Sequence, residues 1–424
     1  MMPARLKTIE ILTKELNDMT QQTNLSKRWW ILATGVFTML FAGIIYAWSI
    51  LKVPFATDFG FDNAALALNF TLTMSFFCLG GFLSSRLVRL IGTKLTLIIA
   101  GLLSGIGFVL APIVGIKSSL ALYITYALMA GLGIGMAYIL IISTVNAWFP
   151  DRRGFSSGAL MMGFGASTLI LGNLADALFE SSLGFQNTFI LFGIALGVVI
   201  PLSSLIIKAP SKETVLPAPQ KKANAKAEAF EAKDYTPLEM IKRFTFWRAF
   251  VALVCLTAVG SSVISFARDL ALSVGAQATL ATTLVGVLAI CNGLGRIITG
   301  AVFDAIGRRF TMTWASILTI VAAAVTLISV SIHSLPLCIV GLCLTGLSYG
   351  TSPTMSSAFT AAFYGQKHFA TNLSICNFNL MVASFVATAC SNLFTTSGGY
   401  TAPFILLLSL SGVTLVLNLT IKKP

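Results

Sequence analysis

Charged residues are scarce in this sequence: Asp, Glu, Lys and Arg make up 10% of its 424 residues, whereas soluble domains carry roughly a quarter. Hydrophobic residues make up 56%, and so few charges cannot coat the surface of a water-soluble bundle of this size. Apolar runs of about 20 residues recur along the chain, and each can cross a hydrocarbon core of about 30 Å as a helix. The scarcity of charge therefore excludes a soluble protein and indicates a multi-pass membrane protein.

Residues that usually carry enzymatic chemistry are also few. The only histidines are His333 and His368, both near the ends of predicted spans. The seven cysteines lie within predicted spans and lack metal-ligand spacing, so we interpret them as small apolar packing residues. An enzyme in the membrane would need a nucleophile with its base, paired carboxylates or metal ligands. The sequence therefore predicts neither an enzyme nor a metal site, and it predicts no cofactor.

Hydropathy, read against charged residues and against Pro and Gly, predicts twelve transmembrane helices. The predicted spans lie near residues 30–50, 64–87, 95–116, 120–142, 155–178, 187–207, 247–267, 277–302, 311–332, 336–360, 369–393 and 401–420. A polar stretch rich in Lys, Ala, Pro and Glu separates the sixth span from the seventh and cannot support a packed core. The predicted organisation is a tail (1–29), a six-helix bundle (30–207), a linker (208–246), a second six-helix bundle (247–420) and a short tail (421–424).

Positive charge is distributed unevenly over the two sides of this arrangement. Nearly all of the 28 Lys and Arg residues fall on the side of the tails and the linker, while Lys52, Lys117 and Arg268 fall on the other side. The positive-inside rule then predicts a protein of the plasma membrane or bacterial inner membrane with both termini in the cytoplasm. This topology explains the net charge of +13, and because the charges are scattered over short loops we expect no nucleic acid partner. We expect a monomer in the bilayer.

The two halves of the sequence resemble each other. Residues 77–94, "FCLGGFLSSRLVRLIGTK", overlay residues 292–309, "NGLGRIITGAVFDAIGRR", at a constant offset of 215, so that Leu-Gly, Ile-Gly and the closing basic residue coincide. Parallel repeats with a substrate site between them are one of the architectures of transporters. We therefore predict an all-α membrane protein with two pseudo-symmetric six-helix bundles.

Arg296 interrupts the apolar eighth span. It lies eight residues before Asp304, which is about 12 Å along a helix, so its charge starts close to the middle of the membrane. A charge at that depth costs on the order of 3 kcal/mol. A structural ion pair is the alternative explanation, but no acidic residue lies deep in a predicted span. The missing partner of Arg296 is most simply the anion of a substrate.

Other polar residues accompany Arg296 at helical spacing or on neighbouring spans. Asn292 precedes it by four residues and shares its face of the helix. The further candidates for the same site are Tyr46, Tyr138, Tyr349 and Asn379. Each of them has an alternative explanation in helix packing or in local hydrogen bonding. Together they predict a site for a carboxylate, whose two oxygens a guanidinium can bind in parallel.

Four motifs carry a resemblance to a known family. The run "GAVFDAIGRR" (300–309) resembles the inter-helix loop signature of the major facilitator superfamily. The run "NAWFPDRRGFSSG" (146–158) resembles the hallmark of its oxalate:formate antiporter family and of the related monocarboxylate transporters. The runs "AGIIYAWSILKVPF" (42–55) and "EMIKRFTFWRAF" (239–250) are similar to that family as well. The resemblance covers essentially the whole chain.

The resemblance implies alternating access by rocking of two six-helix domains, with a small carboxylate held midway. Tyr46, Tyr138, Arg296 and Tyr349 match the substrate-site pattern of the family. It also implies that Asp304 and Arg308 latch the two domains on the cytoplasmic side, and we expect Arg152 and Arg153 to join them. In the first half, Arg89 stands where an aspartate is usual.

Three departures from the family narrow the expected substrate. Leu380 stands where the oxalate carrier of the family has a lysine, and a single fixed cation would leave a dianion under-compensated. Asn292 and Ile50 stand where mammalian monocarboxylate transporters have an aspartate and a lysine that are linked to proton coupling. We therefore expect a monocarboxylate such as lactate, pyruvate or formate, moved by exchange for another anion or together with a proton. An oxalate or dicarboxylate antiporter remains an alternative, and a non-transporting carboxylate sensor is a third.

Overall fold

The structure, a computed structural model, describes residues 26–211, 214, 216–217 and 234–421. Every regular element in these ranges is helical, as expected in a bilayer, where each segment must satisfy its own backbone polar groups. Residues 1–25 and 422–424 of the predicted tails and about half of the predicted linker lie outside the described residues. The predicted all-α fold of twelve transmembrane helices is confirmed.

The first half contains six membrane crossings. The first crossing, Ser26–Ala47, ends in the 3-10 helix η1 (Gly43–Ala47), and the second and third together form α4 (Asn63–Leu110). Among the described residues, eleven helices are long and apolar enough to span a membrane, and α4 supplies two crossings because it is interrupted at Gly92. The other elements of this half are α2 (Trp48–Leu51), α3 (Val53–Thr57), η2 (Gly115–Lys117), α5 (Ser119–Leu122), η3 (Tyr123–Gly131), α6 (Leu132–Asn146), α7 (Arg153–Ser167), η4 (Thr168–Gly172), α8 (Asn173–Phe179) and α9 (Gly184–Ser203).

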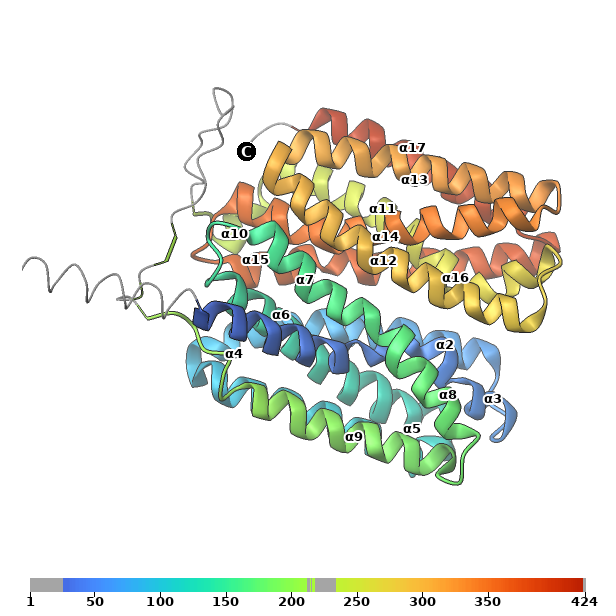
Figure 1. Cartoon of the computed structure of the whole chain (residues 1–424), viewed down its shortest axis with the longest axis horizontal. Coiled ribbons are helices and arrows are strands. Elements are labelled where there is room, and N and C mark those ends of the chain that lie inside the picture. The colour runs from blue at the N-terminus through green and yellow to red at the C-terminus, as the bar shows by residue number, and fades with distance from the viewer. Residues whose placement is uncertain (1–25, 212–213, 215, 218–233, 422–424) are drawn as a thin grey trace, which may run out of the picture.

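The second half repeats this arrangement after the short helix α10 (Pro237–Ile241). Its crossings are α11 (Phe244–Ser273), α12 (Ala278–Ile306), α13 (Arg308–Ser331), α14 (Leu335–Tyr364), the pair α15 (Phe369–Cys376) and α16 (Phe378–Ser397), and α17 (Thr401–Thr420). Figure 1 shows the two halves side by side, with the helices running roughly along the long axis of the molecule. Between the halves, α12 packs along α7, and α4 packs against α15 and α16.

Two glycines show the internal repeat in the backbone. Gly92 has φ 78° and ψ 171°, and Gly307 has φ 94° and ψ 178°. This conformation is essentially restricted to glycine, because a Cβ would clash in it. The two positions differ by 215, the same offset at which the sequences overlay. The turn between the second and third crossings therefore has its counterpart between the eighth and ninth.

The two ends of the bundle differ in what they contain. Helices α10 and α15 lie at one end, where α17 also ends, whereas α3 and α8 lie at the other (Figure 1). We call the first the basic end, because it includes Arg28, Arg152 and Arg308, and the second the distal end, which includes Lys52 and Asp176. Among the described residues, most of the loop Lys and Arg residues thus share one end.

Candidate functional site

Arg296 lies on α12, between the two halves, and only 1% of its surface is exposed. Its Nε donates to Oδ1 of Asn292, one turn earlier on the same helix, at 3.1 Å. Its Nη1 donates to the backbone carbonyl of Met161 on α7, in the other half. Its Nη2 has no hydrogen-bond partner, and no carboxylate among the described residues pairs with the guanidinium. The positive charge of Arg296 is therefore buried without a protein counter-ion.

Three tyrosines surround this charge. The hydroxyls of Tyr46, on η1, and Tyr349, on α14, lie 3.4 Å apart and connect the two halves. Tyr46, Tyr138 and Tyr349 all lie within electrostatic range of the Arg296 guanidinium. The ring of Phe164 packs edge-on against Tyr46 and Tyr138, with ring centroids 5.1 and 5.0 Å apart. The structure thus brings five of the six predicted substrate residues, including Asn292, to one place.

Asn379, the sixth predicted residue, makes its hydrogen bonds elsewhere. Its amide nitrogen donates to the hydroxyl of Ser356 at 3.1 Å, and its amide oxygen accepts from Thr257 at 3.3 Å. Its neighbour Leu380 is buried and packs into the hydrophobic core that is built mainly by the first half. The described contacts place Asn379 in a hydroxyl-rich contact between helices of the second half.

The two halves close tightly at the basic end. A Cβ on Gly154, at the start of α7, would lie 2.5 Å from the carbonyl oxygen of Gly300 on α12. The carboxylate of Asp304 accepts from the backbone N–H groups of Gly154 and Phe155 at 3.1 and 3.0 Å. A carboxylate is stabilising at a helix N-terminus, where unsatisfied N–H groups and the helix dipole favour negative charge. Asp304 therefore ties α12 of one half to α7 of the other, and its role as a latch stays a prediction.

The basic residues predicted as gates contribute in different ways. Arg153 lies within electrostatic range of Asp304 and adds attraction across the same contact. The contacts of Arg308 include the carbonyl of Ile421 at 3.4 Å and the ring of Phe363, whose centroid lies 5.0 Å from its guanidinium carbon. Those contacts anchor helices of the second half to one another.

Arg28 is a functional candidate that the sequence did not identify. Its Nη1 lies 2.8 Å from Oδ1 of Asp151, and both side chains are more than nine-tenths buried. Arg152, the predicted gate, lies 3.8 Å from the other oxygen of Asp151 and is largely exposed. Arg28 falls within the segment 1–29 predicted as a tail, whereas the first helix of the structure begins at Ser26. Asp151 stands beside Arg152 and Arg153 in the sequence, which indicates an ion pair, but the sequence does not show that its partner is Arg28.

Arg89 occupies the position of Asp304 in the first repeat. Its Nη2 lies 3.3 Å from Nδ1 of His368, at the N-terminal boundary of α15. Since 368 and 153 also differ by 215, His368, which directly precedes α15, is the counterpart of Arg153, the first residue of α7. Equivalent positions of the two repeats therefore both make a contact between the halves. Asp304 accepts from two backbone amides, and Arg89 contacts the ring of His368.

The family profile of the Major Facilitator Superfamily matches residues 31–267 and 249–424 of the chain, which together include both halves. The chain belongs to the Major Facilitator Superfamily. It is a membrane transporter of this superfamily and not an enzyme, and the resemblance stated from the sequence is confirmed.

Relatives of known name support this assignment. The oxalate:formate antiporter of Oxalobacter formigenes is 28% identical over 290 residues, 68% of this chain and 66% of that one. Monocarboxylate transporter 12 of Mus musculus is 26% identical over 408 residues, 89% of this chain and 82% of that one. The solved structure of the proton:xylose symporter XylE superposes with a TM-score of 0.72 at 10% identity, over 94% of this chain and 97% of that one. At that identity, the likeness to XylE shows the fold alone.

The structure has a cavity between the two halves at the distal end. Its volume is about 390 Å³. Its charged lining residues are Lys52 and Asp176 from the first half and Arg268 and Asp269 from the second. Burial lowers the pKa of the Lys52 ammonium, and the nearby carboxylate of Asp269 opposes that shift. The superfamily member is therefore closed at its basic end, while a cavity with four charged lining residues lies between its halves at the distal end.

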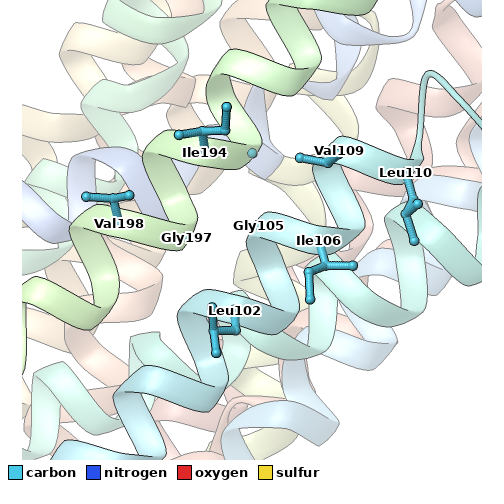
Figure 2. A pocket seen from close by; sticks show the side chains of 9 residues that line it. Leu102, Gly105, Ile106, Val109, Leu110, Ile194, Gly197 and Val198 are labelled. Carbon is cyan, nitrogen blue, oxygen red and sulfur yellow. The ribbon is translucent and has the colours of Figure 1, made fainter.

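A second hollow, of about 280 Å³, lies away from Arg296 on the first half. Figure 2 shows it between α4 and α9, lined by aliphatic side chains such as Ile106 and Ile194. The helices approach closely there, since a Cβ on Gly105 would lie 2.7 Å from the carbonyl oxygen of Gly193. This apolar groove offers no polar group that could orient a charged substrate.

Proposed function

We propose that the chain is a secondary active transporter of small organic anions that carries a monocarboxylate, such as lactate, pyruvate or formate, bound at Arg296. The observation that carries the proposal is the buried Nη2 of Arg296, which has no partner between the two halves. A buried cation is costly unless an anion compensates it, and a bound carboxylate would supply both the charge and the acceptor oxygens. The relatives named oxalate:formate antiporter and monocarboxylate transporter 12 support a carboxylate as that anion.

A single negative charge suits this site better than two. Leu380 brings a buried aliphatic side chain to the position where the resemblance implies a second cation. A dianion at Arg296 would then keep about one uncompensated charge in a medium of low dielectric. The name of the Oxalobacter relative favours the second candidate, an antiporter of oxalate or another dicarboxylate.

We propose that the basic end faces the cytoplasm of a cell membrane, because loops rich in Lys and Arg remain on that side. The distal cavity would then admit substrate from outside, and rocking of the halves would open the basic end for release. All residues of the proposed site come from one chain, so a monomer suffices. The second transported species is either a counter-anion or a proton.

Transport by the purified protein in proteoliposomes tests the proposal. Uptake is measured with lactate, pyruvate, formate, acetate, glyoxylate and oxalate as competitors, with and without a pH gradient and with and without internal anion. We expect saturable uptake in which a monocarboxylate competes better than oxalate. Preference for oxalate would establish the second candidate instead, and binding of a carboxylate without flux would indicate a sensor.

Leu380→Lys should improve recognition of dicarboxylates. A second fixed cation would compensate the second carboxylate, and we expect oxalate to compete about tenfold better, equivalent to about 1.4 kcal/mol. The measurement is competition by oxalate against monocarboxylate uptake. Leu380→Met is the control, because it keeps the volume and adds no charge. Unchanged competition by oxalate in a folded Leu380→Lys protein would place Leu380 outside the site.

A further inference from the structure

We propose that Gly165 is a positioning residue for the substrate anion. It opens the space in which the guanidinium of Arg296 lies against the backbone of α7, so that Nη2 is the nitrogen presented to the substrate. This inference rests on the proposed function, and it adds how the opposite half of the protein shapes the site.

The guanidinium lies face-on over Gly165. A Cβ at position 165 would lie 3.1 Å from Cζ, 3.3 Å from Nη1 and 3.4 Å from Nη2 of Arg296. Three nearly equal distances place that point above the plane of the group, since a point in the plane would be clearly nearer to some of these atoms than to others. These distances are shorter than ordinary van der Waals contacts. Any side chain at position 165 would therefore push the guanidinium away from α7.

The hydrogen bonds of Arg296 leave one nitrogen open. Nε is taken by the side chain of Asn292 and Nη1 by the carbonyl of Met161. Nη2 is buried and has no hydrogen-bond partner among the described residues, so both of its N–H groups can donate to a substrate oxygen. The carboxylate would therefore meet Arg296 mainly through Nη2, with its second oxygen left to the tyrosine hydroxyls. This differs from the parallel two-nitrogen arrangement expected from the sequence.

The contact also crosses between the halves. Met161 and Gly165 are four residues apart, so they share one face of α7, and that face holds the side chain of a residue on α12. Gly158, on the same helix, approaches the backbone of Arg296, where a Cβ would lie 2.8 Å from the carbonyl oxygen. The first half thus fixes where the cation of the second half points.

Gly165→Ala should weaken substrate binding while keeping Arg296 and the three tyrosines of the site. We expect the KM for pyruvate uptake in proteoliposomes to rise about tenfold, equivalent to about 1.4 kcal/mol, while kcat changes less than about twofold. The control is Gly293→Ala on α12, where the new Cβ would meet only Cγ of the flexible Met162, at 3.3 Å. Its KM and kcat should match those of the wild type. A lowered kcat at unchanged KM in Gly165→Ala would assign Gly165 to helix packing and overturn the proposal.

A double variant separates positioning from folding. Lysine carries no guanidinium to collide with a Cβ, so Gly165→Ala should add no further rise in KM in an Arg296→Lys background. If Gly165→Ala alone does not fold, Arg296→Lys combined with Gly165→Ala should fold, and failure of that rescue would contradict the proposal. Wild-type protein in the same assay distinguishes failure of the proposed function from failure of the positioning role of Gly165. Wild type that transports none of the carboxylates overturns the proposed function as well, whereas active wild type with an unchanged KM in Gly165→Ala overturns the positioning role only.

Discussion

Arg296→Ala should abolish saturable carboxylate uptake, with an expected loss of at least about a hundredfold, which corresponds to about 2.7 kcal/mol of lost binding. The expected loss is large because the substitution removes the buried guanidinium, the cationic group of the candidate site, and leaves the carboxylate without it. The protein should still fold, since a lone charge in the membrane costs on the order of 3 kcal/mol and its removal lifts that cost. Uptake in proteoliposomes and the melting temperature of the purified protein measure the two effects.

Two further variants serve as controls for this result. Arg309→Ala removes an exposed arginine at the basic end and should leave uptake unchanged. Arg296→Lys keeps the charge but loses the planar group that Asn292 and Met161 hold, so it should retain only a small part of the activity. Wild-type uptake in a folded Arg296→Ala protein would remove Arg296 from the proposed site.

Features imposed by the bilayer could be predicted from the sequence. A span of about 20 apolar residues needs only length and composition to be recognised, so all twelve crossings were predictable. The spacing of Asn292 and Arg296 predicted that they share a helix face, and the 3.1 Å bond between their side chains agrees with it. The offset of 215, from which the sequence predicts two similar halves, also separates the glycine turns of the structure at Gly92 and Gly307.

Contacts that involve backbone atoms across the two halves could not be predicted. The carbonyl of Met161 accepts from Arg296, and the guanidinium lies where a Cβ of residue 165 would crowd it, yet neither feature has a sequence pattern that names its partner. Asp304 was expected to latch the halves, but its acceptance from two backbone amides at the start of α7 follows only from how α7 and α12 meet. Such contacts depend on the relative position of the halves, which the proposed alternating access would change.

Gly154 and Gly300 bring the backbones of the two halves close together at the basic end. A Cβ on Gly300 would collide with the carbonyl group of Gly154 and would lie 3.4 Å from the nitrogen of Phe155. The clashing atoms belong to the backbone of α7, which cannot move aside as the end of a flexible side chain can. The branched side chain of Gly300→Val would therefore separate α7 from α12 and break the bonds from Gly154 and Phe155 to Asp304.

Gly300→Val should consequently hold the transporter open at its basic end, because the substitution raises the free energy only of the states that are closed there. We expect uptake to fall at least about tenfold and carboxylate binding to be retained. A reporter is Ser357→Cys, since the Ser357 hydroxyl lies 2.9 Å from that of Ser157 across the halves and is buried in the closed state. A membrane-impermeant maleimide applied from the basic side should label it faster in Gly300→Val, relative to protein with the native cysteines alone. Gly412→Val, where nothing lies within 4 Å of the Cβ position, should change neither uptake nor labelling. Unaltered uptake in Gly300→Val would mean that closure at this glycine pair is not required for the transport cycle.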